Sequence, residues 1–312
     1  MGHASSLASE DVLNVKPKGV RKEIIKMSKN KTIKFQVQNI LMLLLAIGES
    51  RRNAKAESED NKSPLIHSWS TYNNYVKICI AFGNWVKENF HIKEVADMKP
   101  YVSAYLKYRS DCGLSAWTVR LDAAALAKLY GCTSNDFGVD LPERKRSEVN
   151  RSRGEVKKFS EENHAEIVTF CKATGVRIHE LKALTKEDVF TDEGKVFVLV
   201  KCGKGGKSRI VPVLEGHEED VLKIAERCVG DKELLFKKKD IPARLPSHKY
   251  RAMYAKAQYE SLARPIDDIP TKERYICRKD KAGIIYDKKA TEKVSKMLGH
   301  NRISVIAESY LY

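Results

Sequence analysis

Four side chains that could act on a phosphodiester follow one another in the second half of the chain. Arg177 comes at a turn after a predicted helix, and Lys204 lies in a glycine-rich hairpin at residues 201–209. His300 and Tyr310 come near the C-terminal end of the sequence. Cations could bind a phosphate, and a phenol could attack it. These residue types suggest a reaction at a phosphodiester with a tyrosine as nucleophile.

The hairpin has a competing interpretation as a nucleotide-binding loop, since Gly206, Lys207 and Ser208 are adjacent. A phosphate loop needs an earlier glycine at a set spacing, and it leads into a helix. Lys201 occupies the position of that glycine, and a predicted strand follows the hairpin. The nucleotide-binding interpretation is therefore excluded.

Composition favours a polyanionic partner. The 312 residues suffice for two compact domains and carry a formal net charge of +16, with a pI of about 9.4. The seven cysteines are scattered and form no Cys-x-x-Cys pair, which indicates a reducing compartment and no zinc site. The longest apolar run, residues 40–47, is too short to cross a bilayer. We expect a cytoplasmic, nucleoid-associated protein that binds no metal, cofactor or membrane.

Four regions are expected along the chain. Residues 1–62 form a basic segment, a possible DNA-contacting arm, with one helix at 35–48 and a charged linker at 49–64. Residues 63–139 form an all-α domain, because apolar residues recur at helical spacing from Tyr75 to Val86, and Ser115 can cap a later helix. Residues 140–158 are a basic interdomain linker, and residues 159–312 form the domain that holds the candidate site.

The last region is predicted to be mixed α/β and mostly helical, with a small antiparallel sheet. Ser160 can cap its first helix, and Gly175 marks the turn that follows. Two strands flank the glycine-rich hairpin because β-branched residues dominate there. The remaining expected elements are helices at 178–184, 221–228, 250–257 and 290–298, strands at 195–200 and 209–213, and a short strand at 234–236.

Several of these motifs together resemble the tyrosine recombinase (phage integrase) family. They are residues 174–181 around Arg177, the strand pair that carries Lys204, the Leu-Gly-His sequence that ends at His300, and Tyr310. Residues 114–118 look like part of that family's core-binding domain. The resemblance covers residues 65–312, and it implies a helical core-binding domain followed by a catalytic domain.

The resemblance also implies a role for each residue. Arg177 and a second arginine would clamp the scissile phosphate, and Lys204 would act as general acid at the leaving 5′ oxygen. His300 would hydrogen-bond a phosphate oxygen, and Tyr310 would attack phosphorus to give a 3′-phosphotyrosyl intermediate. A tyrosine with an ordinary pKa needs a cationic field to react at neutral pH, which two arginines supply. Neither ATP nor a metal would be required.

The second arginine has two candidates. The family's His-x-x-Arg pattern fits His248 and Arg251, although the interval from there to His300 is longer than usual. Arg278 fits the interval better, but Tyr275 stands where the pattern has histidine. We favour His248 and Arg251, and residues 274–287 then read as an inserted basic hairpin.

The nucleophile also has an alternative, because Tyr312 lies two residues after Tyr310. The sequence around Tyr310 matches the family's tail better, so Tyr310 is favoured. Glu180, next to Arg177, is expected to be structural rather than catalytic.

The expected partners are double-stranded DNA recombination sites, with four protomers synapsing two duplexes to integrate or excise a mobile element. An excisionase or a host DNA-bending protein could assist. The alternatives are a DNA-binding protein on a recombinase scaffold without activity, and a nicking-resealing enzyme like a type IB topoisomerase.

Overall fold

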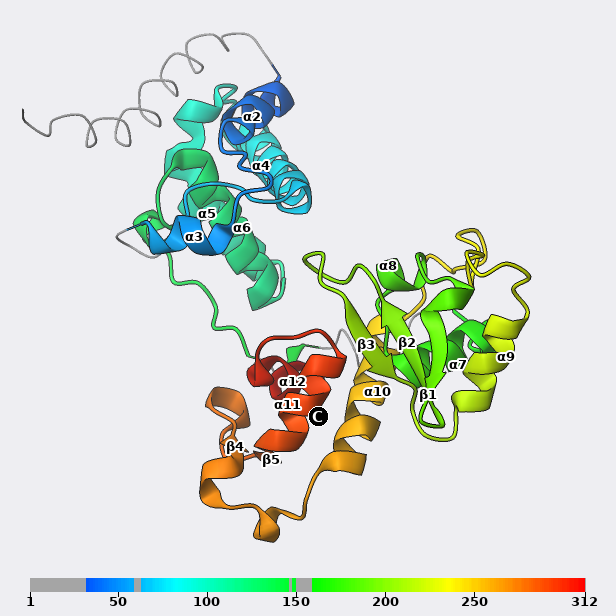
Figure 1. Ribbon diagram of the computed structural model, residues 1–312. Helices are drawn as coiled ribbons and strands as arrows, with labels where there is room; N and C mark the ends of the chain where they lie inside the picture. Colours follow the sequence, from blue (N-terminus) through cyan, green and yellow to red (C-terminus); the bar gives the residue numbers. More distant parts are fainter. Residues whose placement is uncertain (1–31, 59–62, 146–147, 150–158, 312) are drawn as a thin grey trace, which may run out of the picture. The chain divides into compact units, whose positions relative to one another are not determined.

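The computed structural model describes residues 32–58, 63–145, 148–149 and 159–311. The chain divides into two compact units, Met1–Arg144 and Lys145–Tyr312. The first unit is helical where it is described, and the second combines helices with small antiparallel sheets (Figure 1). The predicted fold class is thereby confirmed. Within the described residues, no helix is both long and apolar enough to cross a membrane.

Serine and threonine caps begin most helices of the first unit. Thr32, Ser50, Ser68 and Ser115 each accept a hydrogen bond from a backbone N–H in the first turn that follows, which satisfies a donor that the helix leaves unpaired. The helices are α2 (Ile33–Met42), α3 (Arg51–Ala56), α4 (Trp69–Phe90), α5 (Val102–Asp111) and α6 (Ala116–Tyr130).

Helix α2 packs in the same core as α4. Ile33 Cγ2 lies only 2.5 Å from where a Cβ on Gly83 would be, so the missing side chain lets the two helices approach closely. The buried Gln36 amide donates to the Lys93 carbonyl and accepts from the Val95 N–H. These bonds tie α2 to the segment that leads to α5.

The secondary structure of this unit differs in detail from the expected one. The helix expected at 35–48 ends at Met42, and Leu45 instead forms an isolated parallel bridge with Ile66. The region expected to be a linker contains α3, which Ser50 caps. Of the segments assigned to the arm and the linkers, residues 1–31, 59–62, 146–147 and 150–158 lie outside the described residues.

The second unit packs helices around a three-stranded antiparallel sheet of order β1-β2-β3. Its apolar core joins the buried faces of the sheet and of the surrounding helices, and α10 packs against both α7 and α11. The elements are α7 (Ala165–Thr174), α8 (Ile178–Leu181), β1 (Val189–Asp192), β2 (Lys195–Val200), β3 (Arg209–Pro212), α9 (Glu218–Glu226), α10 (Ser247–Leu262), β4 (Arg274–Ile276), β5 (Ile285–Asp287), α11 (Lys288–Met297) and α12 (Ile303–Ser309).

The predicted hairpin at 274–287 is present as the antiparallel pair β4–β5. Other expectations for this unit were incomplete: β1 and α12 were not predicted, and α8 ends at Leu181 rather than at 184. Residues 234–236 do not form a strand of their own, because only Leu234 pairs, in an isolated bridge with Thr185.

Candidate active site

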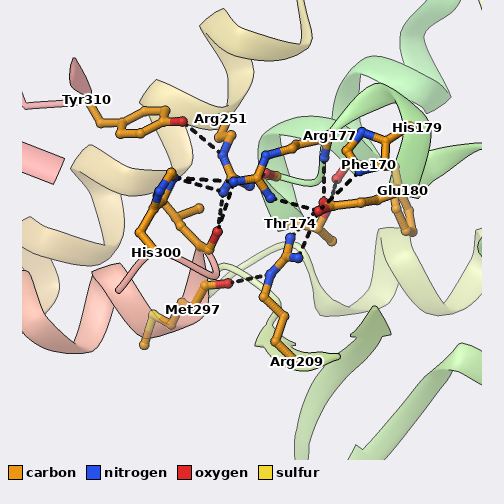
Figure 2. A network of polar contacts seen from close by, with 12 residues as sticks. Phe170, Thr174, Arg177, His179, Glu180, Arg209, Arg251, Met297, His300 and Tyr310 are labelled. Atoms are coloured by element: carbon orange, nitrogen blue, oxygen red, sulfur yellow. Dashed lines mark hydrogen bonds and ion pairs between the residues drawn. The ribbon is translucent and has the colours of Figure 1, made fainter. Parts of the chain in front are cut away.

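Four of the predicted site residues converge within the second unit from segments far apart in the sequence. Arg177 precedes α8, Arg251 lies on α10, His300 follows α11, and Tyr310 follows α12. Figure 2 shows their polar groups directed toward one another.

The turn after α7 sets the position of Arg177. Gly175 ends α7 with φ of 58°, a left-handed conformation that glycine adopts without steric cost. A Cβ at Gly175 would lie 2.7 Å from Tyr254 Cδ1, so α10 packs directly on the turn. Arg177 then caps α8 with extended backbone, and its N–H donates to Glu180 Oε2 at 2.8 Å. The turn therefore directs the Arg177 side chain into the site.

Glu180 is a buried carboxylate that binds two arginines. Arg177 NH1 donates to Oε1 at 2.8 Å, while Arg209 donates to Oε1 at 2.9 Å and to Oε2 at 2.7 Å. Burial by itself raises the pKa of Glu180, but hydrogen bonds and charge from Arg209 and Arg177 outweigh it and lower the pKa to about 2. Glu180 is thus ionised at neutral pH and fixes both guanidinium groups.

Arg251 is the largest fully buried side chain of the described chain, with 1% of its surface exposed. NH1 donates to the Gly175 carbonyl at 2.5 Å, NH2 donates to the Leu298 carbonyl, and Nε donates to the Tyr310 hydroxyl at 3.2 Å. Burial lowers the pKa of Arg251 to about 10, so the group remains cationic at neutral pH.

His300 faces both arginines. Its Nε2 lies 3.4 Å from Arg177 NH2 and 3.5 Å from Arg251 NH2. Burial, followed by the charges of Arg251, Arg177 and Lys204, lowers the pKa of His300 to about 4. The imidazole is therefore neutral at pH 7, and its Nε2 can accept from these guanidinium groups.

Tyr310 lies at the end of α12, where its own N–H and that of Leu311 both donate to the Ile306 carbonyl. The side chain is nearly buried at 8% exposed. Its ring centroid lies 5.6 Å from that of His300 and 5.7 Å from Arg251 Cζ. The phenol oxygen therefore lies beside a buried cation, which stabilises a developing phenolate.

Two predicted residues lie at the margin of this network. Lys204 is exposed in the turn between β2 and β3, and it reaches the site through its charge, which contributes to the lowered pKa of His300. His248 is half-buried in the first turn of α10, one helical turn before Arg251.

The alternative residues are placed differently. Arg278 is exposed and precedes the short turn Lys279–Lys281 in the β4–β5 hairpin, and Tyr275 is half-buried in β4. The structure therefore brings Arg251, and not Arg278, to Arg177. Tyr312 lies outside the described residues.

Arg209 is the site residue that sequence reasoning missed. It begins β3, and its Nε also donates to the Met297 carbonyl at 2.9 Å. A Cβ on Gly203 would lie 2.9 Å from Arg209 NH1 and 2.8 Å from the Lys207 carbonyl oxygen, so the hairpin fits tightly over the guanidinium. The alternation of side chains along β3 could have predicted this position, because Arg209 lies on the same inward face as the buried Val211.

The site has the donors of an anion-binding centre. Arg177 and Arg209 bind one ionised carboxylate, and the charge of Arg251 lies close to both arginines, so positive charge is in excess there. Within the described residues, no group of three or more His, Cys, Asp or Glu side chains could hold a metal ion. Guanidinium groups bind phosphate oxygens in a bidentate geometry, so this arrangement suits a phosphate group.

Comparison with known proteins points to one family. The sequence profile described as the phage integrase family matches residues 148–311. No curated protein matches the sequence significantly.

Similar solved structures include the XerH site-specific recombinase bound to a palindromic difH substrate in a post-cleavage complex. It is 14% identical with a TM-score of 0.50, and the match covers 90% of this chain and 93% of that one. XerH in a pre-cleavage difH complex is 16% identical with a TM-score of 0.47, covering 94% and 90%. The Tn1549 transposon integrase with circular intermediate DNA is 12% identical with a TM-score of 0.44, covering 88% and 95%.

At these identities the solved structures bear on the fold alone, whereas the sequence profile spans more than half of the chain and includes every residue of the network. The chain belongs to the phage integrase family, the tyrosine recombinases.

Proposed function

We propose that the protein is a site-specific DNA recombinase that cleaves and rejoins DNA through a 3′-phosphotyrosyl intermediate. The observation that carries the proposal is the 3.2 Å contact between Arg251 Nε and the Tyr310 hydroxyl, with Arg177 and His300 at the same point. This contact places the proposed nucleophile, Tyr310, beside Arg251, which would bind the phosphate that Tyr310 attacks.

The reaction uses the residues as follows. Arg177 and Arg251 bind the non-bridging oxygens of the scissile phosphate, and neutral His300 donates its ring N–H to one of them. Tyr310 Oη gives up its proton to solvent and forms a bond to phosphorus as the bond to the 5′ oxygen breaks, and Lys204 gives that oxygen a proton. A 5′ hydroxyl from a partner strand then attacks the phosphotyrosine, which releases Tyr310 and reseals the DNA. His248 supports Arg251 from the preceding turn of α10.

Lys204 must move toward the phosphate in this scheme. It stands in an exposed turn rather than in the network, and the glycines at 205 and 206, both with positive φ, shape that turn. A bound phosphate supplies the negative charge that draws the lysine inward. DNA binding therefore completes the site.

The partner in this proposal is double-stranded DNA, which the net charge of +16 favours and which the solved XerH and Tn1549 complexes contain. The helical domain at 63–139, together with α2, would supply DNA contacts, and the domain at 159–312 would supply the chemistry. Four protomers would synapse two duplexes to integrate or excise a mobile element.

Covalent capture tests the proposal. A nicked suicide duplex made from the ends of the element that carries this gene traps the intermediate, and a denaturing gel detects the protein–DNA adduct. We expect an adduct at Tyr310 that is lost in Tyr310→Phe and in Arg251→Ala. Tyr275→Phe, which removes a half-buried hydroxyl outside the network, serves as the matched control and retains the adduct.

Other outcomes would revise the proposal. An adduct mapped to Tyr312, or one that requires Arg278 and not Arg251, would keep the chemistry and overturn the residue assignment. Binding without any adduct would indicate a DNA-binding protein without activity. Nicking and resealing without exchange between paired sites would indicate a topoisomerase-like enzyme.

A further inference from the structure

The β4–β5 hairpin contains one buried cation in an otherwise exposed stretch. Lys281 is 8% exposed, while Arg278, Lys279 and Asp280 before it and residues 282–284 after it are exposed. Burying an ammonium group is costly unless it is fully hydrogen-bonded, and a lysine also loses rotamer freedom. Favourable hydrogen bonds must therefore offset the free-energy cost of burying Lys281.

Lys281 is held by hydrogen bonds to the chain segment that carries Tyr310. Lys281 Nζ donates to the carbonyls of Ala307 at 3.1 Å, Glu308 at 3.4 Å and Leu311 at 3.1 Å. An ammonium has three N–H donors, and these carbonyls provide acceptors for them. The first two carbonyls belong to the last turn of α12, where a helix leaves its carbonyls unpaired and a positive charge is favourable.

A second residue of the hairpin reinforces this contact. The Tyr286 hydroxyl donates to the Leu311 carbonyl at 3.0 Å. Lys281 thus holds the main chain on both sides of Tyr310, and Tyr286 holds it at the following residue, Leu311. The Tyr310 hydroxyl accepts a hydrogen bond from Arg251, so both the main chain and the hydroxyl of Tyr310 are fixed.

The hairpin is itself anchored to the helix that carries Arg251. Arg264, just after α10, binds both carboxylate oxygens of Asp287 at 2.8 and 2.9 Å and Glu273 at 2.8 Å. The Tyr259 hydroxyl, on α10, accepts from the Asp287 N–H at 2.9 Å. A continuous set of contacts therefore runs from α10 through the hairpin to the segment of Tyr310.

We infer that Lys281 is a positioning residue for the attack by Tyr310, acting through the main chain at the end of α12. The inference rests on the proposed role of Tyr310 as nucleophile. A misplacement of the attacking atom by about 1 Å can slow a reaction on the order of 100-fold. Removing the ammonium group lets the last turn of α12 open, and the hydroxyl then leaves the position set by Arg251.

The test compares Lys281→Met with Lys279→Met in the full-length protein. Both variants lose one positive charge from the same turn, but Lys279 is exposed. The readouts are the Kd for the site duplex, the single-turnover rate of adduct formation at saturating suicide duplex, and hydrogen exchange of the Tyr310 and Leu311 amides without DNA.

We expect the two variants to bind duplex within about twofold of each other, because they lose the same charge. The adduct should form about 10- to 100-fold more slowly in Lys281→Met than in Lys279→Met. Exchange of the Tyr310 and Leu311 amides, which both donate to the Ile306 carbonyl, should accelerate only in Lys281→Met.

Equal adduct rates in the two variants would overturn the inference while leaving the proposed function intact. A wild-type protein that binds duplex and forms no adduct at Tyr310 would instead overturn the proposed function itself. If Lys281→Met loses duplex binding through misfolding, Tyr286→Phe decides, since it removes one hydroxyl only. A severalfold slower adduct in Tyr286→Phe supports the inference, and a wild-type rate contradicts it.

Discussion

Replacing Glu180 by glutamine tests whether one buried carboxylate holds the two arginines beside it. Glu180→Gln keeps the size of the side chain, but it removes the negative charge between Arg177 and Arg209. The pKa of Glu180 falls from 4.5 to about 2 in the folded protein, a difference worth about 3 kcal/mol. Loss of one partner from a buried ion pair costs about 3–5 kcal/mol. We therefore expect the free energy of unfolding of the second unit to fall by about 3 kcal/mol at pH 7.

The distribution of tryptophan gives the assay an internal reference. All three tryptophans, Trp69, Trp85 and Trp117, lie in the first unit. Urea unfolding followed by tryptophan fluorescence reports on that unit, and far-UV circular dichroism reports on both. Glu180→Gln should shift the dichroism transition of the second unit and leave the fluorescence midpoint unchanged.

The matched control is Glu187→Gln, which breaks an exposed pair with Lys201 whose atoms lie 2.6 Å apart. Exposed pairs contribute about 0–1 kcal/mol, so this variant should be nearly neutral.

The carboxylate of Glu180 stabilises the fold above pH 4.5, and this stabilisation is lost as pH falls toward 2. The difference between wild type and Glu180→Gln should shrink over that range. Equal stability of the two Glu→Gln variants at pH 7 would refute the reasoning.

Two further predictions concern His300 and Gly203. The pKa of His300 falls from 6.5 to about 4 on folding, so stability should decrease as pH falls from 6.5 through 4, by at most about 1.4 kcal/mol per pH unit. Urea unfolding at pH 6.5 and 5 should show this loss in wild type and not in His300→Gln; the same slope in both would contradict it. Gly203→Ala places a Cβ 2.8 Å from a main-chain oxygen, and we expect a cost of about 1–3 kcal/mol in the same assay and slower adduct formation. Gly230→Ala, where nothing lies within 4 Å, is the control, and equal effects would contradict the steric argument.

The helices that were predicted well are those with long apolar periodicity. The stripe from Tyr75 to Val86 lies within α4, and Ser115 caps α6 as expected. Helix α12 was missed because it has seven residues and no side-chain cap. Strand β1 has four residues, only half of which are apolar, and it forms because β2 supplies its hydrogen-bonding partner. Short elements of this kind depend on tertiary contacts that a single sequence does not display.

Most residues of the candidate site could be predicted from the sequence, but one could not. Residue order and motif spacing singled out Arg177, Arg251, His300 and Tyr310, which the structure brings together. Arg209 was not singled out, because its role depends on the packing of β3 against Glu180, far from it in the sequence.

The hydrogen bonds that position Arg251 affect which substitutions the surrounding residues can tolerate. Two of its guanidinium nitrogens donate to main-chain carbonyls, those of Gly175 and Leu298. Every residue type carries a carbonyl, so these two bonds place no demand on the side chains that supply them. What must be inherited is the path of the backbone, which at Gly175 depends on a left-handed turn against Tyr254. Neutral substitutions can therefore accumulate around the site while the guanidinium keeps its place.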